Sequence, residues 1–62
     1  MHQIRVAYDV NGTVINERFT GHKITYIRPT PESAVVIVYN ENDEIMRSLS
    51  YAKCHRLDWI DK

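Results

Sequence analysis

Cysteine and histidine are the side chains of this sequence that could bind a metal ion. The chain has one cysteine, Cys54, and three histidines, His2, His22 and His55. Zinc sites are usually built from ligand pairs at short spacing, such as C-x₂-C or H-x₃-H. Cys54 and His55 are adjacent instead, and adjacent side chains of a strand point to opposite faces. The spacing therefore predicts no metal site and no cofactor, with a buried cysteine and exposed histidines.

Cys54 could also act as a nucleophile, because Lys53, His55 and Arg56 surround it in the sequence. Nearby positive charge favours the reactive thiolate, and histidine is a common partner base. A chain of 62 residues, however, leaves little room for a substrate cleft and an oxyanion site beside its core. We therefore expect a protein that is not an enzyme and has no catalytic residue.

Basic and aromatic residues could instead form a face that binds nucleic acid. The stretch from Arg47 to Arg56 contains no acidic residue, and small β-barrels bind single strands by combining basic grooves with stacking aromatic rings. The chain carries eight basic and eight acidic residues, whereas nucleic-acid-binding domains usually have a basic excess. Nucleic-acid binding is therefore the alternative function. Its candidate residues are Lys23, Tyr26, Arg28, Arg47, Tyr51, Lys53 and Arg56.

Length and composition indicate one small domain that comprises residues 1–62. Hydrophobic residues make up 44% of the chain, which is too many for a disordered protein. No apolar run approaches the roughly 20 residues that span a bilayer, and the N-terminus does not resemble a signal peptide. A lone free cysteine is typical of a reducing compartment. The expected location is the cytoplasm, with no membrane contact.

The strands that must position these residues are organised around the apolar run Ala34–Tyr39. Four of its residues are β-branched, which favours a strand, and the lack of a polar break predicts burial of both faces. Two prolines exclude a strand from Pro29 to Ser33. Alternating or apolar stretches predict four more strands, over His2–Val10, Thr13–Phe19, His22–Arg28 and Ile45–Ser50.

Two turn signals separate these strands. Asn11-Gly12 predicts a hairpin, and a two-residue turn there would place Phe19 opposite Ile4. A longer turn would shift the pairing by one residue, so the sequence leaves this register open. Asn40–Glu44 is polar and acidic and predicts the second turn.

The tail after Ser50 allows two interpretations. One is a short helix, and the favoured one is a 3₁₀ turn over Tyr51–Cys54 followed by a strand with Leu57 and Trp59 on one face. Together the elements predict an all-β fold. We expect a small SH3-like barrel or a highly curved antiparallel sheet of five to six strands, with the 3₁₀ turn near the C-terminus.

The function predicted from these features is a non-enzymatic interaction module that binds another protein and can also form a homodimer. A chain this short cannot bury every apolar side chain, and an open sheet keeps edge strands that recruit other strands. Its size and neutral charge are typical of a bacterial or phage accessory protein. The candidate interface residues are Val14, Ile27, Met46 and Trp59.

Overall fold

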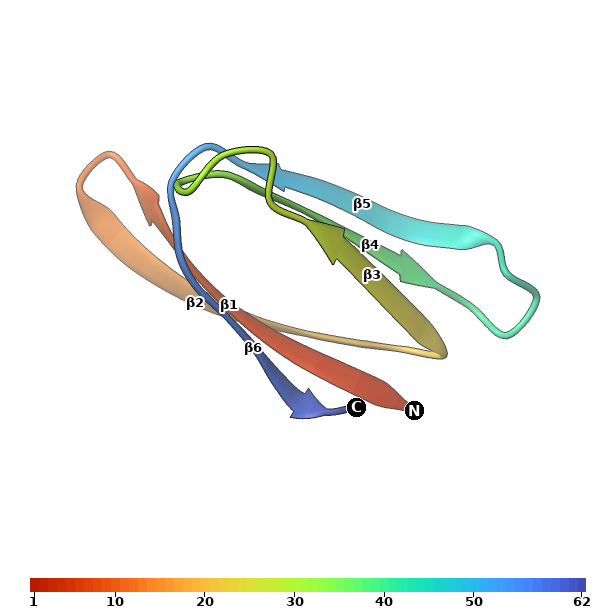
Figure 1. Cartoon of the computed structure of the whole chain (residues 1–62). Coiled ribbons are helices and arrows are strands. Elements are labelled where there is room, and N and C mark those ends of the chain that lie inside the picture. Colours follow the sequence, from red (N-terminus) through yellow and green to blue (C-terminus); the bar gives the residue numbers. More distant parts are fainter.

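The computed structural model describes residues 1–62 and shows an all-β fold without a helix, as predicted. The strands are β1 (His2–Val10), β2 (Thr13–Gly21), β3 (Lys23–Ile27), β4 (Ala34–Tyr39), β5 (Ile45–Tyr51) and β6 (Cys54–Asp61). They form two antiparallel sheets, the first in the order β2-β1-β6 and the second in the order β3-β4-β5 (Figure 1). The two sheets do not close into a barrel, and no helix is present that could cross a membrane.

The β1–β2 hairpin closes with the tight turn predicted at Asn11-Gly12. Asn11 and Gly12 have φ angles of 51° and 82°, and Val10 pairs with Thr13. Positive φ at both central positions defines the two-residue type I′ turn, which Asn-Gly adopts at low cost. This turn places Ile4 opposite Phe19. The two-residue alternative is therefore the register of the hairpin.

β2 and β3 belong to different sheets, and the chain turns sharply at His22 to pass from the first sheet to the second (Figure 1). β2 continues through Gly21, two residues beyond the expected end at Phe19, so the break between the two strands lies at His22. A Cβ atom on Gly21 would lie 2.5 Å from Val38 Cγ1. The missing side chain thus allows β2 to pass close to β4 at this corner.

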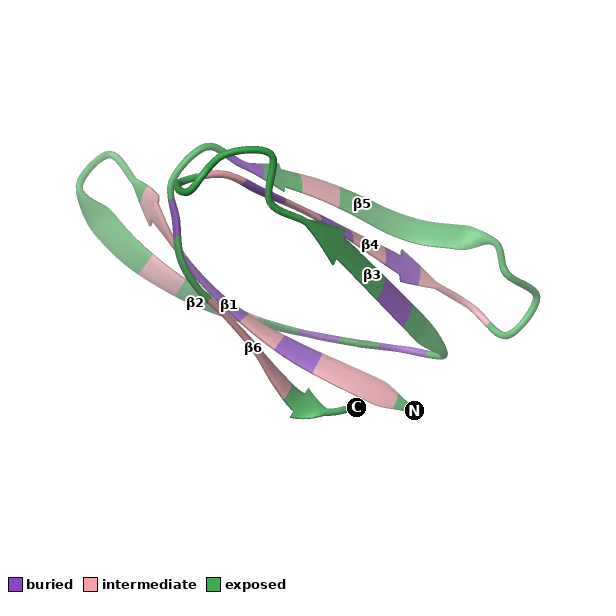
Figure 2. Ribbon diagram, viewed as in Figure 1, coloured by how far each residue is buried: buried purple, intermediate pink, exposed green.

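The core lies between the two sheets and is built from alternate residues of each strand (Figure 2). Ile4, Val6 and Val36 have no exposed area. Partly buried side chains, including Leu57 and Trp59 of β6, pack against this cluster. The buried cluster comprises Ile4, Val6, Phe19, Ile24, Ala34, Val36, Val38, Tyr51 and Cys54.

β4 is the central strand of the second sheet, but only one of its faces is buried. Its inward-facing residues lie in the core, whereas Val35, Ile37 and Tyr39 on the other face are partly exposed (Figure 2). The expectation that both faces are buried was therefore wrong. The physical reason is that six short strands make only two layers, so nothing stacks on the outer side of the second sheet.

The tail is a strand, but the expected 3₁₀ turn before it is not formed. Ala52 and Lys53 make a simple bend between β5 and β6. The backbone N–H of Asp9 donates to the carbonyl of Lys53 at 2.8 Å, and that of Cys54 donates to the carbonyl of Glu32 at 2.6 Å. These bonds hold the bend against β1 and the β3–β4 loop, in place of the internal bonds of a helical turn.

Candidate functional site

The outer face of the first sheet carries paired charges. Arg5 Nη2 lies 3.5 Å from Asp58 Oδ2, and Arg56 Nε donates a hydrogen bond to the same carboxylate oxygen. The bond from Arg56, followed by the charges of Arg56 and Arg5, holds the pKa of the Asp58 carboxyl below its usual value. Such a surface of balanced charges is an ordinary solvated face.

The outer face of the second sheet is different, because it is almost uncharged and carries most of the exposed aliphatic residues of this sheet. It is formed by the outward-facing residues of β3, β4 and β5, which the strand register aligns in three rows. Only one of the nine carries a charge, and the others are aliphatic, aromatic or hydroxyl side chains. The rows are Ile27–Val35–Ser50, Thr25–Ile37–Ser48 and Lys23–Tyr39–Ile45, and we call these nine residues the outer apolar face.

The aliphatic side chains of the outer apolar face are contiguous and accessible. Ile27 is 63% exposed and Ile45 is 60% exposed. Each stands beside an apolar residue of β4, Ile27 next to Val35 and Ile45 next to Tyr39. Side chains paired in this way lie about 5 Å apart. Scattered exposed aliphatic residues are normal, but a continuous apolar surface is typical of an interaction site.

The single charge of this face is accommodated at one corner. Lys23 Nζ lies 5.0 Å from the centre of the Tyr39 ring, where the ring face attracts the ammonium group. Tyr39 also lies near Thr25, whose Oγ1 is 3.5 Å from its hydroxyl oxygen. The middle of the face around Ile37 is therefore free of charge.

The structure does not bring the four predicted interface residues together. Ile27 belongs to the outer apolar face. Met46 lies at the edge of this face, beside Ile45, as the extra residue of a β-bulge in β5. Val14 lies on the opposite side of the molecule, on the outer face of the first sheet. Trp59 is partly buried against the core.

The seven residues of the predicted nucleic-acid face are also dispersed. Arg28 Nη2 donates to the carbonyls of Cys54 at 2.7 Å and Pro31 at 3.0 Å, so its guanidinium group holds the β3–β4 loop. Tyr51 is buried in the core. Arg56 forms an ion pair with Asp58 on the outer face of the first sheet.

The other members of that set occupy three further places. The Arg47 guanidinium carbon lies 4.8 Å from the centre of the Phe19 ring, at the margin of the core. Lys53 lies in the bend before β6. Lys23 is on the outer apolar face, and Tyr26 contacts Trp59 from the inner side of the same sheet. The seven residues therefore do not form one continuous face.

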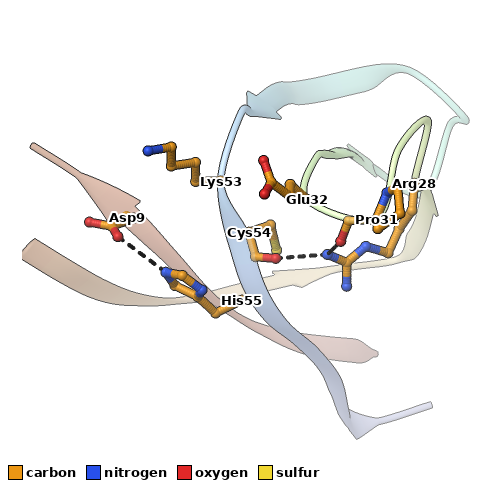
Figure 3. Close-up of a pocket in the computed structure, with 7 residues that line it drawn as sticks. All are labelled: Asp9, Arg28, Pro31, Glu32, Lys53, Cys54 and His55. Atoms are coloured by element: carbon orange, nitrogen blue, oxygen red, sulfur yellow. Dashed lines mark hydrogen bonds and ion pairs between the residues drawn. The ribbon is translucent and has the colours of Figure 1, made fainter. Parts of the chain in front are cut away.

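A polar hollow of about 480 Å³ opens where the β3–β4 loop meets the bend before β6 (Figure 3). His55 Nε2 lies 3.3 Å from Asp9 Oδ2 at its margin. Cys54 is buried, as predicted, and its thiol donates to the carbonyl of Arg56 at 3.5 Å. The imidazole is thus directed to a carboxylate and not to the thiol. The lining residues are Asp9, Arg28, Pro31, Glu32, Lys53, Cys54 and His55.

A second hollow, of about 280 Å³, lies near the two chain ends, which are side by side (Figure 1). The Trp59 ring centre is 6.4 Å from that of His2 and 6.1 Å from that of Tyr26. The lining contains two lysines and no carboxylate side chain. We call it the aromatic hollow; it is lined by His2, Lys23, Ile24, Trp59 and Lys62.

Two tyrosines in contact close the core at the other end of the sandwich, where the tilted rings of Tyr8 and Tyr51 have their centres 4.4 Å apart. Tyr8 donates a hydrogen bond to the Glu17 carboxylate, which raises the pKa of the Tyr8 hydroxyl. Burial, with a further contribution from Glu17, raises the pKa of Tyr51 to about 12. Both hydroxyls therefore stay protonated at neutral pH and provide no general base.

Arg28 and His55 beside the polar hollow, and Tyr8 of the tyrosine pair, are held by hydrogen bonds within the fold. No group of three His, Cys, Asp or Glu side chains lies close enough together to hold a metal ion. The outer apolar face has no such structural role within the chain, and it is the candidate functional site. No protein-family model, curated protein or solved structure matches this chain.

Proposed function

We propose that this chain is a non-enzymatic interaction module that binds a protein through its outer apolar face. The observation that carries the proposal is the contrast between the two sheets, one with paired charges outside and the other with contiguous aliphatic residues. Burial of apolar surface is the main driving force of association. Lys23 does not oppose it, because a corner charge can stay in water at the rim of an interface.

The geometry of the face favours a partner that stacks on the sheet. Stacked sheets pack about 10 Å apart with interdigitating side chains, and the rows around Ile37 supply aliphatic side chains for such contacts. The lone free thiol supports a cytoplasmic location, and the small size supports a bacterial or phage accessory role.

A double variant replaces the two exposed isoleucines of the face, Ile27→Ser with Ile45→Ser. We expect it to lose protein binding but to remain folded. Both side chains are exposed, so stability should change by less than about 1 kcal/mol. The measurement is affinity capture from the native host with quantitative mass spectrometry. The matched control is Val10→Ser with Val14→Ser, at exposed valines of the first sheet. If the Ile27→Ser, Ile45→Ser variant captures the same proteins in the same amounts as the wild type, the proposal is contradicted.

For the architecture, we infer an open SH3-like arrangement. Two features support it: the chain passes directly from β2 of the first sheet to β3 of the second at His22, and the first sheet pairs the first strand of the chain with the last. Corners at which the chain switches sheets are typical of small barrel-like sandwiches. An NMR structure in which β2 and β3 lie in one flat sheet would contradict this inference.

A second candidate function is the binding of an unpaired nucleic-acid base in the aromatic hollow. Its support is the row of three rings beside two lysine side chains, with no aspartate or glutamate in the lining. Stacking of a base on an aromatic side chain contributes about 1–3 kcal/mol. Of the residues predicted for nucleic-acid binding, only Lys23 and Tyr26 contribute to this place.

Trp59 is the only tryptophan, so its fluorescence reports directly on this hollow. An oligothymidine is expected to quench the fluorescence, whereas an abasic oligonucleotide of equal length does not. Lys62→Glu should weaken the quenching and reduce its salt dependence, and Arg18→Glu, on the outer face of the first sheet, should change it less. Equal quenching by the two oligonucleotides, or none, would exclude base stacking at Trp59.

A further inference from the structure

We propose that the protein bound by the outer apolar face is a second copy of this chain, in a symmetric dimer. This inference rests on the proposed function and names the partner of the same site. Three features of the face favour a copy over an unrelated chain: its polar groups, the position of its charge, and the geometry of the neighbouring edge strand.

The polar groups of the face are chemically self-complementary. Thr25, Tyr39, Ser48 and Ser50 present hydroxyl groups, and a hydroxyl can both donate and accept a hydrogen bond. Two identical hydroxyl-bearing surfaces can therefore satisfy each other. A strongly charged partner, by contrast, would bury its charges against a face that offers one ammonium group.

The position of that ammonium group permits a symmetric contact. Ile37 lies at the centre of the three rows, and Lys23 lies at a corner. A two-fold axis in the plane of the face, through Ile37 and parallel to β4, stacks Lys23 on Ile45 of the second copy. An axis perpendicular to β4 stacks it on Ile27. Neither arrangement brings two lysines together, so like charges do not oppose dimerisation.

The neighbouring edge strand favours stacking of faces over pairing of edges. β3 and β5 are the two edge strands of the second sheet, and a bulge at Met46 interrupts the register of β5. A bulge kinks an edge and reduces its ability to pair with another strand. The apolar side chains of the sheet are therefore better buried by a second face than by an extended sheet.

The size of the face sets the strength of the dimer. Three strands about 4.8 Å apart, with five residues that each rise about 3.3 Å, cover roughly 240 Å² per copy in projection. Even with the relief of the side chains, the total buried area stays below the about 1,200 Å² of a standard interface. We therefore expect a weak dimer, with a dissociation constant in the micromolar range.

Opposite charges placed at Ile37, on the two-fold axis, test the dimer. The measurement is sedimentation equilibrium at protein concentrations from about 1 µM to about 1 mM. The wild type should pass from monomer to dimer. Ile37→Lys and Ile37→Glu should each remain monomeric, because like charges meet at the axis. An equal mixture of the two variants should dimerise again, and Asn16→Lys on the first sheet should behave as the wild type. Far-ultraviolet circular dichroism at the lowest concentration verifies that each variant is folded.

Three results would overturn the dimer: a wild-type monomer throughout, dimerisation unchanged by Ile37→Lys, or a mixture of variants that stays monomeric. These results are distinguishable from failure of the proposed function. If the wild type is monomeric but the Ile27→Ser, Ile45→Ser variant loses captured proteins, the face binds a different protein. If that variant loses nothing, the proposed function fails as well.

Discussion

Replacement of Ile4 by alanine is expected to unfold the domain. Ile4 is completely buried in β1, between Phe19 of β2 and Trp59 of β6. Truncation of a buried isoleucine costs about 2–5 kcal/mol, and a domain of this size typically has only about 3–5 kcal/mol of stability. Urea unfolding followed by circular dichroism should show a variant that is largely unfolded without denaturant.

The matched control is Ile37→Ala, which removes the same atoms from the partly exposed face of β4. Measured at low concentration, where the chain is monomeric, it should lose clearly less stability than Ile4→Ala. The sequence alone pointed to Ile37 as a core residue. Equal losses for the two variants would show that the outer side of β4 is covered and that the assignment of the two faces is wrong.

The second large effect is expected for Gly21→Ala, at the corner where β2 approaches β4. The added methyl group would lie 2.5 Å from Val38 Cγ1 and 3.2 Å from the carbonyl oxygen of Tyr39. Val38 is buried and has a stiff β-branched side chain, so it cannot move aside easily. Overpacking of this kind costs about 1–3 kcal/mol, which urea unfolding will measure.

A double variant identifies the cause of that loss. Val38→Ala removes the atom that the new methyl group would meet, so Gly21→Ala with Val38→Ala should lose less than the sum of the single variants. Strictly additive losses would show that the two side chains do not meet. Gly12→Ala is the control for backbone strain alone: no atom lies within 4 Å of its added carbon, and its positive φ costs about 1 kcal/mol.

The strands and the first turn were predictable because their signals are local. Alternation identified β1, Asn11-Gly12 identified the hairpin, and prolines at positions 29 and 31 identified the loop before β4. The burial of β4 was not predictable in the same way. An apolar run is compatible with a strand covered on both faces and with one that has a core face and an open apolar face. The number of layers decides between them, and that depends on the whole chain.

The candidate site was harder to predict than the fold, because it depends on register between distant segments. Ile27 meets Val35 across the β3–β4 ladder, and Tyr39 meets Ile45 only because a bulge shifts the β4–β5 ladder. Of these residues, the sequence singled out Ile27 alone. The charges were equally misleading, since Arg28 is held by backbone carbonyls and cannot also form a basic face.

The pairing of β1 with β6 has a consequence for folding during synthesis on the ribosome. The β1–β2 hairpin joins neighbouring segments and can form as soon as they emerge, but β6 pairs with β1 across nearly the whole chain, from Gln3 to Asp61. Contacts between such distant segments form slowly, typically in milliseconds to seconds. Until β6 has left the exit tunnel, Ile4 and Val6 therefore lack the neighbouring side chains of Leu57 and Trp59. The domain completes its core only after synthesis of its last strand.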